Sequence, residues 1–368
     1  MVEIGPQREL WVIGLMSGTS MDGIDGALIQ TDGDTIYAFG ANVFHSYDDE
    51  FRSRLSNIIG RVPDQAGSTV DVVNELTSRH TKVVKELLKK SQLKSSDIDL
   101  IGFHGHTVLH SPQTKTTCQV GDAKLLAKET GIPVVADFRL SDVAAGGEGA
   151  PLSPAYHVAL SRGLERPLVI LNIGGVANLT WISPDGGAIA FDTGPGNALI
   201  DKWVQSQKRG NYDKDGKLAK YGGVKSAILQ SWMENPYFAR SVPKSLDRDD
   251  FAPVVKDLFG VDIADGAATL TAFTAASVCS ASAFLPASPV RWLVTGGGRR
   301  NPVLMAELQM RINTPVEPVE AVGWDGDALE AQAFAFLAAR SAFAMPLTYP
   351  QTTGVLRPMS GGKFHSVE

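Results

Sequence analysis

The chain is poor in cysteine and has no long apolar run. Its 368 residues include only two cysteines, Cys118 and Cys279, which form no CxxC pair and so argue against a disulfide framework or a zinc knuckle. Nowhere do eighteen apolar residues follow one another, because the closest segment, 267–284, is interrupted by Thr and Ser. The first ten residues lack the basic start and apolar stretch of a signal peptide. These absences predict a soluble cytoplasmic protein.

Runs of basic charge are missing as well. Lys and Arg number 34 against 40 Asp and Glu, which gives a formal net charge of −6. Without a Lys/Arg cluster, neither nucleic acid nor an anionic membrane is expected as a partner. The hydrophobic fraction of 43% is enough for a large core. At about 150 residues per domain, the length predicts two domains with a cleft between them.

Two stretches of the chain share one layout: a strand, a glycine-rich turn, a second strand, and an Asp-Gly pair that opens a third. The first stretch begins at residues 10–15 and the second at residues 167–173. Amphipathic helices are predicted at 48–59, 70–88, 121–130, 154–160, 197–207, 225–234, 267–283, 303–311 and 325–340. The mixture predicts an α/β protein with two similar sheets, and a domain boundary near residues 137–149.

The first glycine-rich turn, SGTSMDGID at residues 17–25, follows a strand-like run. Glycines let backbone N–H groups approach a phosphate, and the hydroxyls add donors. Asp22 or Asp25 could hold Mg²⁺ through water. An ordinary hairpin with Asp-Gly turn chemistry is the alternative. No GxxxxGK[ST] loop occurs, so a nucleotide would have to be bound by other turns.

Two later segments place glycine between a strand and a helix. In FDTGPGN, Asp192 ends a strand and a helix begins near Asn197, an arrangement that favours an anionic ligand. Asp192 could instead be a helix N-cap, and a dinucleotide fingerprint is disfavoured because Leu199 stands where its third glycine would be. Gly296–Gly298 leave room for a flat ring or a phosphate, unless they only supply positive φ.

Three further groups offer polar chemistry. On a strand, His104 and His106 would point the same way, which suits substrate hydrogen bonding or edge packing better than a metal site without a third ligand. Arg139 lies among carboxylates and could bind a substrate carboxylate or phosphate, or form a structural pair with Asp. Glu330 is either a ligand contact or a first-turn carboxylate favoured by the helix dipole.

Together these segments resemble a known family. GLMSGTSMDGID, DFRLSDVAAGGEGAPLSP, LNIGGVANLT, FDTGPGNALID, TGGGRRNP and DALEAQAFAFLA occur in the order and spacing of the anhydro-N-acetylmuramic acid kinases, from about residue 10 to about residue 360. The resemblance implies a two-domain actin-like ATPase fold with a duplicated ribonuclease H-like core and an interdomain cleft. Domain I would comprise residues 1–138 plus 346–368, and domain II residues 139–345.

The resemblance also implies an activity. Such a kinase opens the 1,6-anhydro ring of its sugar with water while ATP, with Mg²⁺, phosphorylates O6, which yields N-acetylmuramic acid 6-phosphate in cell-wall recycling. By motif, Asp192 would be the general base. The residues implied to bind the nucleotide are Gly18, Thr19, Ser20, Met21, Asp22, Gly23, Ile24, Asp25, Gly174, Gly175, Asn178, Gly296, Gly297 and Gly298. Those implied to bind the sugar are His104, Arg139, Gly194 and Glu330. A homodimer is expected, and His106 stands where the family usually has Gln.

Two rival functions stay open at this point. One is a kinase for another 1,6-anhydrosugar such as levoglucosan, which lacks the lactyl carboxylate. The other is a nucleotide-gated binding module, as in chaperones or actin-like filaments. A comparison of turnover on anhydro-N-acetylmuramic acid and on levoglucosan would distinguish the first rival from the implied kinase. ATP turnover that no anhydrosugar changes would favour the second rival.

Overall fold

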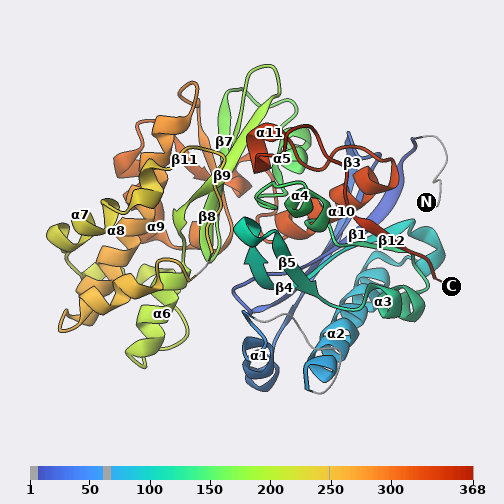
Figure 1. The fold of residues 1–368 in the computed structure, drawn as a ribbon, viewed down its shortest axis with the longest axis horizontal. Coiled ribbons are helices and arrows are strands. Elements are labelled where there is room, and N and C mark those ends of the chain that lie inside the picture. The colour runs from blue at the N-terminus through green and yellow to red at the C-terminus, as the bar shows by residue number, and fades with distance from the viewer. Residues whose placement is uncertain (1–6, 61–67, 248, 368) are drawn as a thin grey trace. The chain divides into compact units, whose positions relative to one another are not determined.

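The computed structural model describes residues 7–60, 68–247 and 249–367. The first six residues, part of the start inspected for a signal peptide, lie outside this range. The described chain forms two compact units (Figure 1). The first unit comprises the residues up to Arg162 and those from Ala328 onward, and the second unit is Gly163–Asp327. The chain therefore leaves the first unit once and returns to it.

The first unit is built on a seven-stranded sheet in the order β12-β6-β4-β1-β2-β3, with β5 paired to β4. The strands are β1 (Leu10–Ser17), β2 (Gly23–Thr31), β3 (Ile36–Ser46), β4 (Leu100–Ser111), β5 (Thr116–Val120), β6 (Val134–Ala136) and β12 (Lys363–His365). Strands β1, β2 and β3 form an antiparallel meander, whereas β4 is parallel to both β1 and β6. Strand β12, from the end of the chain, pairs antiparallel with β6.

Helices cover both faces of this sheet. They are α1 (Asp49–Ser56), α2 (Ser68–Ser91), α3 (Ala123–Thr130), α4 (Leu140–Ala144), α5 (Pro154–Leu160), α10 (Leu329–Ala342) and α11 (Pro350–Thr353). A Cβ on Gly14 of β1 would meet the backbone of α10, whereas one on Gly26 of β2 would meet Val83 and Leu87 of α2. Because Gly26 pairs with Leu15, the neighbour of Gly14, the two helices lie on opposite faces.

The second unit has a five-stranded sheet in the order β11-β10-β7-β8-β9. Its strands are β7 (Leu168–Ile173), β8 (Val176–Ile182), β9 (Ala188–Pro195), β10 (Trp292–Thr295) and β11 (Val316–Pro318), and its helices are α6 (Ala198–Ser206), α7 (Ser226–Met233), α8 (Ile263–Ala281) and α9 (Pro302–Arg311). Residues 263–284 are long and apolar enough to cross a membrane, but their most apolar stretch is 67% buried inside the protein. This segment therefore belongs to the core of the unit.

The two sheets repeat one topology. Read from the meander, the first runs β3-β2-β1-β4-β6 and the second β9-β8-β7-β10-β11, so in both the third, second, first, fourth and fifth strands lie side by side. In each sheet the fourth strand is parallel to the first and the fifth, and the second is antiparallel. This repeat is the duplicated core that the resemblance in the sequence implies. The α/β fold predicted from the sequence is confirmed.

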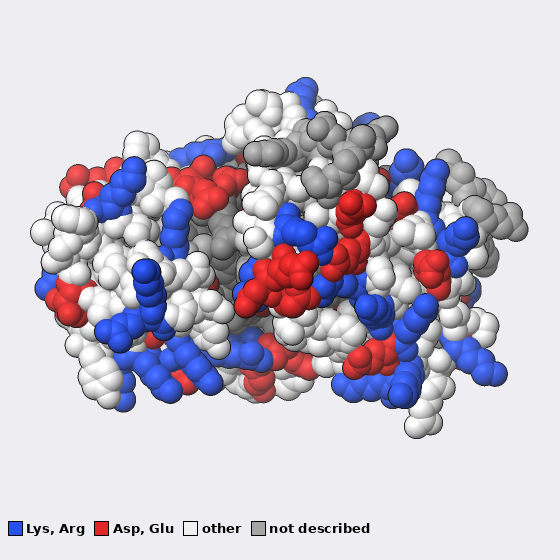
Figure 2. All heavy atoms as spheres, turned by 90° about the horizontal axis from the view of Figure 1, so that it is seen from below, with Lys and Arg blue, Asp and Glu red and all other residues white. Residues whose placement is uncertain are grey.

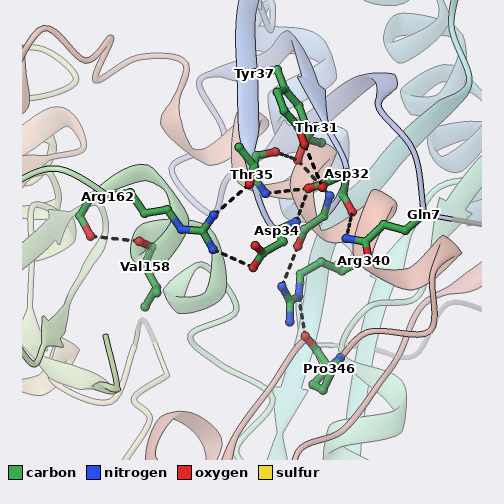
Figure 3. Close-up of polar contacts among 12 residues, drawn as sticks. Gln7, Thr31, Asp32, Asp34, Thr35, Tyr37, Val158, Arg162, Arg340 and Pro346 are labelled. Carbon is green, nitrogen blue, oxygen red and sulfur yellow. Dashed lines mark hydrogen bonds and ion pairs between the residues drawn. The ribbon is translucent and has the colours of Figure 1, made fainter. Parts of the chain in front are cut away.

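The boundaries between the units differ from those expected at 138/139 and 345/346. Helix α10 packs on β1, β2 and β4 of the first sheet, and α5 packs on α10, so both helices belong to the first unit. Arg162, just after α5, donates to Asp34 and Thr35 on the β2–β3 turn. From α10, Arg340 donates to the carbonyl oxygens of Gly33 and Pro346 at 2.7 and 2.6 Å (Figure 3). These contacts fix both helices to the first unit.

The surface carries charges of both signs. Figure 2 shows Lys and Arg side chains interspersed with Asp and Glu on one face. Several basic groups are ion-paired, such as Arg79, whose guanidinium lies 2.6 Å from Asp48 and 2.7 Å from Glu75. On this face the basic groups therefore alternate with acids and do not form a continuous basic stripe.

Candidate active site

The turn between β1 and β2 is the first glycine-rich loop. Residues 18–22 connect the strands, with Met21 at φ 54° and its N–H donating to the Gly18 oxygen at 3.0 Å. Thr19 and Ser20 are exposed, and the Ser20 hydroxyl donates to Asp22 Oδ1 at 2.7 Å. Gly23 and Ile24 already belong to β2, and the Ile24 side chain is fully buried in the core. Residues 18–22 therefore line the turn, and Ile24 supports it.

Groups from outside the loop hold this turn. The Tyr47 N–H donates to the Asp22 oxygen and the Arg52 Nε to the Met21 oxygen, both at 2.9 Å. Below the turn, Ser17 Oγ lies 2.7 Å from Tyr47 Oη and 2.9 Å from His106 Nδ1. Burial raises the pKa of Tyr47, and the nearby Asp22 and Asp25 carboxylates add to this shift. Two carboxylates thus lie close to the turn.

The prediction that His104 and His106 point the same way is wrong. His104 packs against Phe334 of α10, with ring centroids 4.5 Å apart, whereas His106 bonds to Ser17 on the opposite, α2-covered face. Gly105 between them has φ 71°, and this left-handed residue interrupts the strand alternation. No group of three His, Cys, Asp or Glu suited to a metal occurs among the described residues.

His104 supports Arg139. The His104 Nε2 accepts from Arg139 Nη2 at 3.1 Å and its Nδ1 lies 3.0 Å from the Gly105 oxygen. Burial, and then the neighbouring guanidinium, lowers the pKa of His104 well below its usual value, so the ring is neutral at pH 7. Arg139 Nη1 also donates to the Gly149 oxygen at 2.6 Å. The side chain of Arg139 is thus oriented by residues around it, as a recognition group requires.

Other first-unit groups are placed as follows. Glu330 is exposed in the first turn of α10, the position that the helix dipole favours for a carboxylate. His104, in the middle of β4, also lines a cavity of about 350 Å³ beside the ends of β5 and β6. Asp137, which lines the same cavity, has φ 59°, in the left-handed region that Asp adopts more often than most residues. The exposed first-turn position of Glu330 is compatible with both interpretations of this residue, as a ligand contact and as a carboxylate favoured by the helix dipole.

The second unit repeats the glycine hairpin with a helix behind it. Gly174 and Gly175 join β7 to β8, and their carbonyl oxygens accept the N–H groups of Asn197 and Gly196 at 2.8 and 3.0 Å. A Cβ on Gly196 would lie 2.3 Å from the Gly174 oxygen. The hairpin and the start of α6 are therefore in direct contact, which requires glycine at residue 196.

Gly296–Gly298 meet the same edge of the second sheet. Gly296 has φ 74°, and a Cβ there would lie 2.3 Å from Asn172 Oδ1. Gly298 lies against Ile173, while the nearest atom to a Cβ on Gly297 would be Asn197 Nδ2 at 3.7 Å. Three segments that are distant in sequence thus converge at the carboxyl ends of β7 and β10, the edge at which open α/β sheets bind ligands.

Asp192 lies inside strand β9 and is 6% exposed. Its Oδ2 accepts the Leu246 N–H at 2.8 Å. Helix α6 begins at Ala198 after Asn197, so the interpretation of Asp192 as a helix N-cap is wrong. It pairs across the sheet with Asn178. Gly194, also on β9, packs closely against Ser277 of α8. Asp192 is therefore a buried carboxylate held in a fixed direction.

Sequence reasoning missed two features of the second unit. Arg299 donates to Glu320 and Asp327, both at 2.8 Å, and to the Gly296 oxygen at 3.0 Å, so it stabilises the third glycine turn. Its place directly after the three glycines was the only signal. The second feature is a cavity of about 590 Å³ lined by residues 215–224, Ala268 and the first turns of α9. The part of its lining that comes from residues 215–224 shows no helical or strand periodicity, and the rest comes from helices α8 and α9.

Comparisons with known proteins identify the family of the chain. The family model for anhydro-N-acetylmuramic acid kinase matches residues 10–366. The chain belongs to the anhydro-N-acetylmuramic acid kinase family. A family member from Paramagnetospirillum magneticum is 52% identical, with 96% of this chain and 99% of that protein covered. One from Rhodospirillum rubrum is 50% identical, with 96% and 94% covered. A solved structure of (R)-2-hydroxyglutaryl-CoA dehydratase component A from Acidaminococcus fermentans covers 90% of this chain and 99% of its own, at 13% identity and a TM-score of 0.49.

Membership in the anhydro-N-acetylmuramic acid kinase family makes the chain a kinase that uses ATP and a small sugar. The rival interpretation as a nucleotide-gated binding module is not favoured, because the match spans nearly the whole chain.

Proposed function

We propose that this kinase transfers the γ-phosphoryl group of ATP to O6 of 1,6-anhydro-N-acetylmuramic acid while water opens the anhydro ring. The oxygen of water bonds to C1, the C1–O6 bond breaks, and O6 takes the phosphoryl group. The products are N-acetylmuramic acid 6-phosphate and ADP. Family membership carries this proposal, since two relatives named for the substrate are 50% and 52% identical over 94% or more of their length.

Asp192 suits the role of general base in this reaction. The water that attacks C1 must lose a proton, and a carboxylate in hydrogen-bonding reach accepts it. The Leu246 N–H, 2.8 Å from Oδ2, holds one oxygen of the carboxylate and fixes its direction. In a buried position, the carboxylate is also held away from competing solvent.

We assign the polyphosphate to the backbone amides of the glycine turns. Residues 18–22 supply exposed hydroxyls and glycine N–H groups, and Gly174, Gly175 and Gly296–Gly298 provide turns without side chains at the carboxyl edge of the second sheet. The cavity of about 590 Å³ beyond α9 offers space for the nucleoside. Arg139 and Glu330 are assigned to the sugar, with His104 holding Arg139 in place.

The residues near the first turn fit Mg²⁺. Asp22 lies in the turn and Asp25 lies three residues further along the chain, on β2. Mg²⁺ typically keeps several waters and takes one or two carboxylates plus substrate phosphates. Bound there, it would neutralise phosphate charge during transfer. We further infer a cytoplasmic homodimer, which light scattering on the purified chain would test.

The deciding assay measures ADP release with anhydro-N-acetylmuramic acid, with levoglucosan, and without sugar, each with and without Mg²⁺. Turnover should require the muramic sugar and Mg²⁺. Asp192→Asn should abolish sugar-dependent ADP release while ATP still binds. Asp185→Asn, on the exposed β8–β9 turn, serves as the matched control. Near-normal turnover of Asp192→Asn would refute the base assignment, and faster turnover with levoglucosan would refute the substrate.

A further inference from the structure

The backbone on either side of the Asp192 carboxylate is held by one segment, residues 237–246. The Asp192 N–H donates to the Lys244 oxygen at 2.9 Å, and Tyr237 Oη donates to the Asp192 oxygen at 2.6 Å. With the bond from the Leu246 N–H to Oδ2, this segment contacts the backbone donor, the backbone acceptor and the carboxylate of one residue. Strand pairing alone does not explain such contacts, since Asp192 already pairs with Asn178 on its other side.

Lys244 closes this arrangement from the other end. Its side chain is 2% exposed, and Nζ donates to the Tyr237 oxygen at 3.0 Å. The ammonium lies 4.6 Å from the ring centroids of both Tyr237 and Phe284, and 6.0 Å from that of Phe191, the neighbour of Asp192. A cation enclosed by aromatic faces and carbonyl oxygens is compensated for its lost hydration without a carboxylate partner.

The contacts form a closed loop. Lys244 holds Tyr237 through Nζ, Tyr237 holds the Asp192 oxygen through Oη, and Asp192 returns to Lys244 through its N–H. Tyr237 is also fixed independently of the sheet, because its ring packs edge-on against Phe238 and Phe251. Displacing Tyr237 or Lys244 would therefore change the direction of the Asp192 carboxylate while the carboxylate itself stays in place.

We infer that Tyr237 and Lys244 are positioning residues that set the orientation of the Asp192 carboxylate for catalysis. The inference rests on the proposed role of Asp192 as the base. A base must be in place before its proton affinity matters, and misplacement by about 1 Å can cost about a hundredfold in rate. Neither residue is required to touch a substrate. Their loss should therefore lower kcat and leave the KM for both substrates nearly unchanged.

The main test is Tyr237→Phe, which keeps the ring beside Lys244 and removes the bond from Oη to the Asp192 oxygen. We expect kcat to fall about tenfold, with both KM values within about twofold of the unchanged protein and an unaltered melting temperature. The matched control, Tyr212→Phe, changes a tyrosine that is 57% exposed and should leave all three quantities unchanged. Unchanged kcat in Tyr237→Phe, or a loss explained by a lower melting temperature, would overturn the inference.

Lys244 is tested by the pair Lys244→Met and Lys244→Arg. Met fills the space without charge or donor and should lower kcat more than Tyr237→Phe, while Arg should restore part of it. If both Lys244 variants kept the kcat of the unchanged protein, the positioning role of the Lys244 ammonium would be overturned. Asp192→Asn separates the two proposals: if it stays active, the base assignment fails whatever Tyr237→Phe does. If it is inactive and Tyr237→Phe is normal, only the positioning inference fails.

Discussion

Replacing Gly14 by alanine tests the contact between strand β1 and helix α10. A Cβ on Gly14 would lie 1.8 Å from the Ala331 oxygen and 2.6 Å from the Ala335 nitrogen, far inside the usual contact distance of about 3.5–4.0 Å. Both obstructing atoms belong to the backbone, so no rotamer change relieves the clash. Helix α10 would have to move away from the sheet that carries the first glycine turn.

The magnitude follows from two opposing effects. Overpacking of a core costs about 1–3 kcal/mol, and a backbone clash belongs at the upper end of that range. Alanine also reduces the entropy of the unfolded chain, which returns about 0.4–1 kcal/mol. A net loss of about 2 kcal/mol in unfolding free energy corresponds to a melting temperature lower by about 4–8 °C in a unit of this size.

The assay is thermal unfolding, with ADP release measured on the same samples. Gly18→Ala is the matched control, because it lies at the end of the same strand and its Cβ would have only Ser20 Oγ nearby, at 3.5 Å. Gly18→Ala should have the same melting temperature as the unchanged protein, whatever effect it has on nucleotide binding. If Gly14→Ala melts within about 1 °C of Gly18→Ala, the close approach of α10 to β1 is refuted.

Two further predictions concern buried polar groups of the first unit. Arg340→Met removes the hydrogen-bond donors to the carbonyl oxygen of Gly33 and to the hydroxyl of Tyr349. The variant should lower the unfolding free energy by about 3 kcal/mol. A melting temperature within about 2 °C of that of the unchanged protein would contradict this prediction. Burial lowers the pKa of His80 to about 4 and that of His157 to about 3. Below pH 6.5 the unfolded chain therefore binds protons that the native chain does not, and urea unfolding should show stability falling by up to about 1.4 kcal/mol per pH unit for each histidine down to about pH 4. A flat profile over that range would show that these rings are not buried in the neutral form.

The sequence predicted helices and hairpins correctly where a pattern of neighbouring residues is enough to form the element. The predicted helix at 70–88 corresponds to α2, and that at 197–207 to α6, because an apolar stripe at helical spacing reports burial of one face. The two glycine hairpins were also predictable, since each follows a short apolar strand. Residue 24 shows the limit of a motif: it belongs to the same string as Ser20, yet its side chain is buried in the core.

Long-range contacts were not predictable in the same way. The boundary expected after residue 138 moved to Arg162 because that side chain bonds to a turn more than 120 residues earlier in the chain. The direction of His106 depended on one left-handed residue, Gly105, which the period-two pattern does not reveal. Residues 237–246 carry no motif, yet they hold Asp192 through three hydrogen bonds.

Taken alone, the sequence determined the fold class, the two hairpins and the family, because these follow from local periodicity and from strings whose order is specific. The tertiary structure decided which strings meet: Gly296 beside Asn172, Gly196 against Gly174, and Asp192 against Lys244. The physical reason is that such contacts depend on how sheets and helices pack at distances unrelated to sequence spacing. A motif therefore names a residue type at a site, and packing fixes the direction in which its atoms point.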